Sequence, residues 1–210
     1  MIVMHGGLGN ADETERTTGM NRVAQANGFL VTYPNGTGAR MMPNRRTWNA
    51  GKCCGRAAEL NVDDVGFIHA MLADIGSHHP VDRSRVYATG ISNGAMMAYR
   101  LACELPDDIA AIVPVSGTLA VNSCPGARNI PVLHIHGGKD SNVPYQGGMG
   151  ENAISGVAHR SVPETLKMIA SAHGCGAGPN EKDLADIPDN VKTGLTIIPV
   201  TNVREVLKHA

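Results

Sequence analysis

Short apolar runs alternate along the chain with longer segments in which apolar residues recur every three or four positions. The short runs are bounded by glycine or proline and do not alternate strictly with polar residues, which is typical of parallel strands buried on both faces. They predict strands at Ile2–Met4, Phe29–Tyr33, Arg85–Thr89, Ile109–Val115, Val132–Ile135 and Leu195–Val200. The periodic segments predict helices near Glu13–Asn27, Val62–Gly76, Asn93–Glu104 and Pro163–His173.

The order of these elements indicates the fold class. Strand–helix alternation predicts a three-layer α/β domain with a mostly parallel central sheet, in which reactive groups gather where strands end. Residues 34–61 interrupt the alternation and are rich in glycine, asparagine, arginine and cysteine. A long irregular insert of this kind is usually functional, so we expect it to line a site. It holds Trp48, the single tryptophan of the chain.

Composition and charge argue against two classes of binding partner, nucleic acids and membranes. The 210 residues are 42% hydrophobic and 18% charged, which is the balance of a soluble globular protein. Basic and acidic residues number 18 and 19 and are mixed along the chain, so no nucleic-acid partner is predicted. No apolar run approaches the roughly 20 residues that span a bilayer, and no membrane partner is predicted. The first residues lack the features of a signal peptide, which leaves a cytosolic protein or a piece of a longer chain as alternatives.

The candidate nucleophile is Ser92, in the pentapeptide Gly90-Ile91-Ser92-Asn93-Gly94. An apolar, β-branched run at 86–89 precedes it, and helix-forming residues at 95–101 follow it. This is the strand–turn–helix context of a G-x-S-x-G nucleophile elbow. Glycine at both flanking positions removes β-carbons that would collide in so tight a turn. The alternative is an ordinary tight turn that happens to contain serine.

A serine nucleophile needs a base, an orienting acid and donors for the oxyanion. Asp140 follows the predicted strand at Val132–Ile135 in a glycine-rich loop, the position expected for the acid. The backbone N–H groups of Asn93 and of Gly7, in the glycine-rich loop "MHGGLGN", are the candidate oxyanion donors. His5 belongs to that loop and is predicted to be structural.

The histidines beyond Asp140 offer no clear base. They are His159, His173 and His209. None has the glycine-rich setting after a strand that a triad histidine usually has. Each taken alone is typical of a surface histidine.

Several ordered motifs carry a family resemblance over residues 1 to about 175: "MHGGLGN", "GFLVTYPNG", "TWNAGKCCG", "VDDVGFIHAMLADI", "VDRSRVYATGISNGAMMAYRLACELPDDIAAIVPVSGTL" and "VLHIHGGKDSNVPY". Together they resemble the polyhydroxybutyrate depolymerase and feruloyl esterase family of α/β-hydrolases. The resemblance implies the α/β-hydrolase fold, secretion to the extracellular space, no metal or organic cofactor, and action on hydroxyalkanoate or hydroxycinnamate esters. By the same resemblance Ser92 is the nucleophile, Asp140 the acid, Gly7 and Asn93 the oxyanion hole, and Trp48 an aromatic near the substrate cleft.

The chain also departs from that pattern. The strand pair that usually precedes the His-Gly loop is missing, and so is the final strand with its "GGGHxWPG"-like loop bearing the catalytic histidine. We therefore expect residues 1–210 to be a single but partial hydrolase domain, truncated at both ends. The catalytic histidine is then either lost or, without motif support, His209.

The five cysteines fit neither a zinc site nor a CxxC redox site, so no metal is predicted. Buried free thiols and one or two disulfides are the alternatives. We expect Cys53 or Cys54 to be bonded to Cys103 or Cys124, or to lie poised to bond with one of them. Cys175 is expected to stay unpaired, because it resembles a cysteine whose partner precedes the missing strand.

Three functions are compatible with these residues. The first is a serine carboxylic-ester hydrolase that acts through an acyl-enzyme on small esters or polyesters. The second is an inactive or truncated module that binds ligands in the cleft without turnover. The third is a peptidase of the same fold. Because no base is evident, we expect the chain to be a poor esterase. Its oligomeric state is not predicted.

Overall fold

The computed structural model describes residues 1–127, 130–153 and 155–173, and a parallel sheet lies at its centre. The strands β1 (Ile2–Met4), β4 (Tyr87–Ile91) and β5 (Ala111–Val115) pair in the order β1–β4–β5, with both pairs parallel. Parallel bridges extend this sheet on both sides, from Thr32 to β1 and from Val132 and Ile135 to β5. The predicted strands at Phe29–Tyr33 and Val132–Ile135 are therefore present only as these short bridged contacts. The one predicted at Leu195–Val200 lies outside the described residues.

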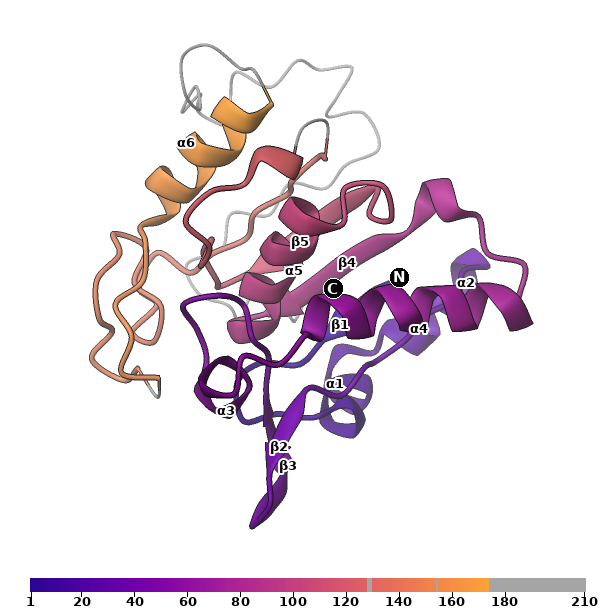
Figure 1. The fold of residues 1–210 in the computed structure, drawn as a ribbon, viewed down its shortest axis with the longest axis horizontal. Helices are drawn as coiled ribbons and strands as arrows, with labels where there is room; N and C mark the ends of the chain where they lie inside the picture. Colours follow the sequence, from indigo (N-terminus) through magenta and orange to yellow (C-terminus); the bar gives the residue numbers. More distant parts are fainter. Residues whose placement is uncertain (128–129, 154, 174–210) are drawn as a thin grey trace.

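Helices cover the sheet in the alternation that the sequence predicts. They are α1 (Ala11–Thr18), α2 (Met20–Asn27), α4 (Asp64–His78), α5 (Asn93–Glu104) and α6 (Val162–Ala172). Figure 1 shows α4 and α5 in front of the strands and α2 behind them. The single helix predicted at Glu13–Asn27 is wrong, because Gly19 adopts a left-handed conformation (φ 63°) that ends α1 before α2 begins. A 3₁₀ turn, η1 (Arg83–Arg85), leads into β4.

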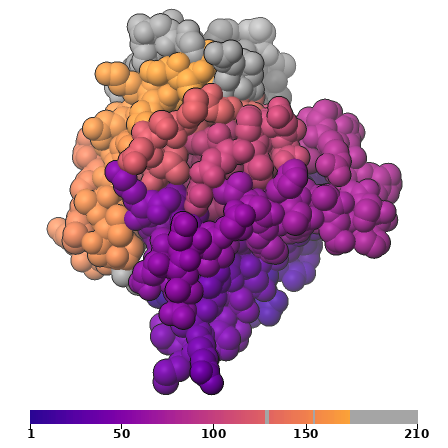
Figure 2. All heavy atoms as spheres, in the orientation of Figure 1, coloured from indigo at the N-terminus to yellow at the C-terminus, as the bar shows by residue number. Residues whose placement is uncertain are grey.

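The insert at 34–61 is more regular than its composition indicated. It contains an antiparallel hairpin of β2 (Thr37–Ala39) and β3 (Met42–Thr47), followed by the short helix α3 (Gly55–Glu59). The hairpin projects from the body of the molecule in Figures 1 and 2, and Met41 at its tip is 92% exposed. Its base is fixed to the first loop, because the N–H of Leu8 donates to the carbonyl oxygen of Arg46 at 2.8 Å.

The core lies between the sheet and α5. Ten of the helix's residues are buried, and α5 packs against β1, β4 and β5. Burial on nearly every side explains why the segment after Ser92 is rich in alanine and methionine instead of showing one narrow apolar stripe. Within the described residues, no helix is both long and apolar enough to cross a membrane.

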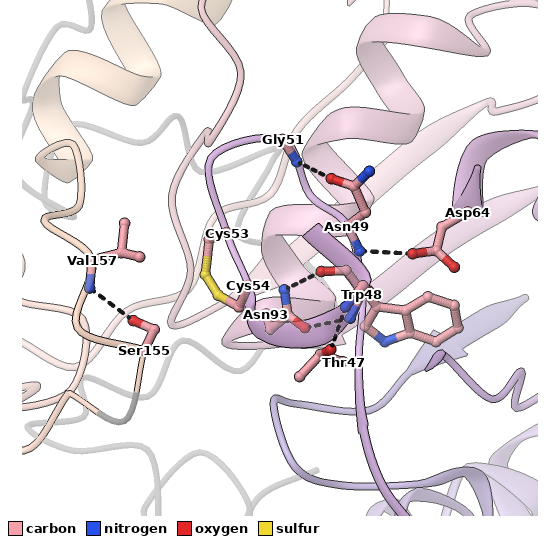
Figure 3. The surroundings of a disulfide bond; sticks show 11 residues. Thr47, Trp48, Asn49, Gly51, Cys53, Cys54, Asp64, Asn93, Ser155 and Val157 are labelled. Atoms are coloured by element: carbon pink, nitrogen blue, oxygen red, sulfur yellow. Dashed lines mark hydrogen bonds between the residues drawn. A yellow bond between two sulfur atoms is a disulfide. The ribbon is translucent and has the colours of Figure 1, made fainter. Parts of the chain in front are cut away.

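The disulfide pairing differs from the expected one. Cys103, in the last turn of α5, bonds with Cys124, just before the 3₁₀ turn η2 (Pro125–Ala127), and their Cα atoms are 4.7 Å apart. Cys53 bonds with its neighbour Cys54 (Figure 3). The expected bond between the two groups is wrong, because each cysteine of the insert has its partner beside it in sequence. Cys175 lies outside the described residues.

Candidate active site

Ser92 occupies a sharp turn between β4 and α5. Its backbone has φ 54° and ψ −117°, an uncommon conformation for a residue with a β-carbon. The turn is held by its own peptide groups: the N–H of Ser92 donates to Val115 O at 2.9 Å, and Ser92 O accepts from the N–H of Met96 at 3.0 Å. The strand–turn–helix placement expected for a nucleophile elbow is therefore present.

The flanking glycines are explained by the crossing of the backbone at this turn. A β-carbon on Gly90 would lie 2.6 Å from the carbonyl carbon of Gly94. One on Gly94 would lie 2.5 Å from the carbonyl oxygens of both Met4 and His5. Such contacts are far inside van der Waals distance, so β1, β4 and α5 can meet here only around glycine.

A cleft of about 700 Å³ opens beside the turn. Ser92, Asn93, Gly7 and Asp140 all line it, although they come from three separate parts of the chain. Thr47 and Cys54 of the insert form part of the same wall.

Asp140 is held in a tight turn at the edge of the cleft. Its Oδ1 accepts hydrogen bonds from the N–H groups of Asn142 (2.9 Å) and Val143 (3.0 Å). Its Oδ2 lies 3.7 Å from Nε2 of His136, and its side chain is 13% exposed. One carboxylate oxygen is thus used to close the turn, while the other remains for a further partner.

The two candidate oxyanion donors, the N–H groups of Gly7 and Asn93, belong to residues that lie side by side at the N-terminus of α5. A β-carbon on Gly7 would be 3.7 Å from Cβ of Asn93. Among the described residues, neither backbone N–H donates to another protein group. An N–H at a helix N-terminus carries part of the positive end of the helix dipole, which suits a developing negative charge.

The side chain of Asn93 has a separate role. Its Oδ1 accepts from the N–H of Trp48 at 2.7 Å and its Nδ2 donates to Trp48 O at 3.0 Å, as Figure 3 shows. The amide therefore satisfies both backbone groups of a buried residue. It fastens the insert to the start of the helix that follows Ser92.

Trp48 itself does not reach the cleft. Its side chain is fully buried, the indole Nε1 donates to His5 O at 3.1 Å, and the ring packs against that of His5 with centroids 4.9 Å apart. The substrate contact expected for Trp48 is therefore corrected to a packing role. An indole enclosed on all sides leaves no surface for a ligand.

His5 is a structural histidine in this arrangement. It is buried, its Nε2 accepts from the N–H of Gly36 at 3.0 Å, and its Nδ1 lies 2.8 Å from Gly6 O. Nδ1 therefore carries the proton. Burial lowers the pKa of His5, which favours this neutral ring.

The histidines that follow Asp140 have different surroundings. His159 lines the cleft with Ser92 and Asp140, which its loop sequence did not indicate; an antiparallel bridge to Gly148 carries it there. Burial lowers the pKa of His159, and the negative charge of Asp140 opposes this. Its ring makes no hydrogen bond within the described part of the chain. His173 ends α6, and His209 lies outside the described residues.

The sequence analysis missed a half-buried pair, His134 and His136, next to residues 137–143, the loop that carries Asp140 and is called the acid loop below. The alternating His-Ile-His pattern at the end of a predicted strand was the available signal, since residues two apart in a strand share a face. Their rings stack with centroids 5.2 Å apart. No group of three or more metal-ligating side chains is present among the residues that the structure describes.

A parallel sheet, a serine at a strained strand-to-helix turn and a glycine-rich loop beside it define an α/β-hydrolase. Solved structures show the same fold: the chain superposes on esterase PE8 with a TM-score of 0.53 at 21% identity, over 68% of this chain and 70% of that one. It superposes on a structure described as sOPH native with a TM-score of 0.55 at 17% identity, over 84% and 68%.

The chain belongs to the esterase PHB depolymerase family, whose family model matches residues 1–145. It is 29% identical over 207 residues to feruloyl esterase B of Piromyces equi, covering 94% of this chain and 37% of that protein. It is 36% identical over 153 residues to a putative esterase, NocK, of Nocardia uniformis subsp. tsuyamanensis, covering 70% and 41%. The chain thus spans about two fifths of the length of these relatives. Residues 175–210, which include Cys175 and His209, match a different model, that of the Lon protease (S16) C-terminal proteolytic domain.

Proposed function

We propose that the chain carries the chemistry of a serine carboxylic-ester hydrolase. Ser92 attacks the ester carbonyl, the N–H groups of Gly7 and Asn93 bind the oxyanion, and Asp140 orients the histidine that takes the proton. The histidine passes this proton to the departing alcohol as the acyl-enzyme forms, and an attacking water then releases the acid and restores Ser92. The observation that carries the proposal is the strained elbow at Ser92, which opens on the same cleft as Gly7 and Asp140.

The proposed substrates are esters of hydroxycinnamates or hydroxyalkanoates. Membership of the esterase PHB depolymerase family and the similarity to a feruloyl esterase support both classes. A cleft of about 700 Å³ is within the usual range for small-molecule sites, so it can hold one hydroxycinnamoyl group or a few hydroxyalkanoate units.

We also propose an extracellular location, because disulfides form and persist mainly in oxidising compartments.

A second candidate function is ligand binding without turnover. The hydrogen bonding of His159 favours this candidate. His159 shares the cleft with Ser92 and Asp140, but within the described residues its ring makes no hydrogen bond to either one. A serine without a hydrogen-bonded base stays protonated and is a weak nucleophile. We therefore expect weak turnover, near the roughly 10³–10⁴-fold acceleration over water that an oxyanion hole and binding alone provide.

The test compares the chain with Ser92→Ala and with Ser123→Ala, a change at an exposed serine away from the cleft. Turnover of p-nitrophenyl acetate and methyl ferulate is measured together with covalent labelling by a fluorophosphonate, located by mass spectrometry. Labelling at residue 92 that Ser92→Ala abolishes and Ser123→Ala retains supports the hydrolase. Equal turnover by the chain and Ser92→Ala, together with no labelling at residue 92, would contradict it.

The same assay separates the two candidates. Vigorous turnover that depends on Ser92 would mean that a base is present, and His159→Ala and His209→Ala would then identify it. Binding of methyl ferulate by calorimetry with no labelling at Ser92 would favour the binding module instead.

A further inference from the structure

Three side chains form a continuous run of hydrogen bonds beneath the acid loop. The hydroxyl of Tyr99, on α5, lies 2.8 Å from His134 Nδ1, and His134 Nε2 lies 3.1 Å from His136 Nδ1. His136 Nε2 then lies 2.8 Å from the carbonyl oxygen of Val143. Tyr99 is fully buried and the side chain of His136 is 1% exposed, so these groups have to satisfy one another.

The Val143 carbonyl oxygen at one end of this chain of hydrogen bonds determines which group donates in each bond. A carbonyl oxygen can only accept, so His136 Nε2 carries a proton, and in a neutral ring His136 Nδ1 is an acceptor. It therefore accepts from Nε2–H of His134, whose Nδ1 in turn accepts from the Tyr99 hydroxyl. Each of the three hydrogen bonds then has one donor and one acceptor.

The surroundings favour these protonation states. Burial raises the pKa of the Tyr99 phenol well above its ordinary value, so the hydroxyl keeps its proton. Burial, together with the neighbouring His136, lowers the pKa of His134 to about 4, so this ring is uncharged near neutral pH.

Reversing donor and acceptor along this chain of hydrogen bonds leaves the Tyr99 hydroxyl without an acceptor in the described part of the chain. If His136 carried a second proton, it would donate to His134, which would donate to the Tyr99 oxygen. The Tyr99 hydroxyl hydrogen would then have no acceptor within the described residues. A buried, unpaired donor costs about 1–3 kcal/mol, which favours the neutral direction.

We propose that Tyr99, His134 and His136 are positioning residues that set the acid loop against the nucleophile helix. Val143 connects the two parts, because its carbonyl oxygen accepts from His136 while its N–H donates to Oδ1 of Asp140. These two groups lie in consecutive peptide units that meet at the Cα of Val143, so a shift of this residue moves the carboxylate.

The other end of the run is anchored on the helix that Ser92 begins. α5 starts at Asn93, directly after Ser92, and carries Tyr99 less than two turns later. Ser92 and Asp140 are consequently connected through one helix and three side chains. The role of Asp140 in this inference rests on the proposed hydrolase function, whereas the hydrogen-bond order does not.

The experiment uses Tyr99→Phe, which removes the first donor and keeps the ring. Tyr87→Phe is the matched control, since Tyr87 is 37% exposed on β4. In ¹⁵N-labelled protein near neutral pH, imidazole nitrogen shifts report the tautomers of His134 and His136. Amide hydrogen exchange reports the Asn142 and Val143 N–H groups that donate to Asp140.

We expect both rings to carry their proton on Nε2 in the unmodified chain. In Tyr99→Phe, exchange at Asn142 and Val143 should rise roughly threefold to tenfold, the range for loss of one hydrogen bond. Tyr87→Phe should leave it unchanged. A proton on Nδ1 of either ring in the unmodified chain, or unchanged exchange in Tyr99→Phe, would overturn the inference.

A further variant pair separates positioning from general destabilisation. His136→Gln keeps an N–H group that can reach Val143 O, whereas His136→Ala does not. In the folded protein we expect Gln to retain slow exchange at Val143 and Ala to lose it, and equal exchange in both would contradict the proposed order. Absence of fluorophosphonate labelling at Ser92 would refute the proposed function alone, because tautomers and exchange are measured without turnover.

Discussion

The backbone strain of the candidate active site lies mainly at one residue, Ser92. A non-glycine residue at φ 54° is strained by about 1–3 kcal/mol, and it persists only where its surroundings determine it. Here the surroundings are the peptide groups of Val115 and Met96 and the two glycines on either side. The strain places the serine side chain beyond the end of β4, where it faces the cleft.

The flanking glycines give a prediction at this scale. Gly94→Ala should lower the free energy of unfolding by at least about 1–3 kcal/mol, because its β-carbon would press on the carbonyl oxygens of β1 and the first loop. Gly138→Ala is the control, since a β-carbon there meets nothing within 4 Å and should change the free energy by no more than about 0.5 kcal/mol. Urea unfolding followed by circular dichroism measures both. Equal stability of the two variants would show that the close approach at Gly94 is tolerated.

Not every residue could be placed from the sequence. The elbow could, because its turn is encoded within five consecutive residues. Trp48 and His159 could not: burial of the indole depends on how the insert folds over His5, and His159 reaches the cleft through pairing with Gly148. Contacts between distant segments decide both positions, and local patterns do not report them.

At the scale of elements, the sequence predicted the parallel sheet and the main helices well. Periodic apolar positions are a strong signal where an element packs on a single core. Two errors have local causes: a single left-handed glycine divides the first helix, and the hairpin at Thr37–Thr47 escaped notice. Four of the six residues of β3 are exposed, so this strand lacks the apolar alternation by which strands are recognised.

The disulfide at the end of α5 supports a prediction about these elements. The Cys103–Cys124 bond spans 21 residues, and a loop of this size stabilises the folded state by about 3 kcal/mol. Replacing both cysteines by alanine should lower the melting temperature markedly. The matched variant Cys53→Ala/Cys54→Ala should have a much smaller effect, since a bond between neighbours closes almost no loop. Calorimetry under oxidising conditions compares the two, and similar losses in both would contradict the loop-closure explanation.

At the scale of the whole molecule, α5 connects the insert with the segment that leads into the acid loop. Its first residue holds the insert through Trp48, and Nη1 of Arg100 donates to Asn49 O at 2.7 Å on the same segment. Asp64 of α4 accepts from the N–H of Asn49 at 2.7 Å, as Figure 3 shows. Tyr99 connects the helix to the acid loop on the other side. The insert, the elbow and the acid loop are therefore positioned by one buried helix, and the sequence could not reveal this because the contacts join segments far apart in the chain.

Histidines that are buried or half-buried make the stability of the whole domain depend on pH. The folded-state pKa of His134 is about 4, below the ordinary 6.5, so between these values the unfolded chain binds a proton that the folded chain does not. The stabilising contribution of the neutral ring is therefore fully present above about pH 6.5 and is lost as the pH falls toward 4. The free energy of unfolding should decrease by at most about 1.4 kcal/mol per pH unit from this one group. Burial also lowers the pKa values of His5 and His159, which act in the same direction.

His134→Gln isolates the contribution of His134, because glutamine does not titrate in this range. Urea unfolding at pH 7.5, 6.5, 5.5 and 5.0 should show a smaller decrease in the free energy of unfolding for this variant than for the unmodified chain, whatever its stability at pH 7.5. The difference in slope, and not the absolute stability, carries the prediction, since the substitution also removes hydrogen bonds. Parallel curves for the two proteins would mean that His134 titrates alike in the folded and unfolded states, and the neutral ring inferred for it would be wrong.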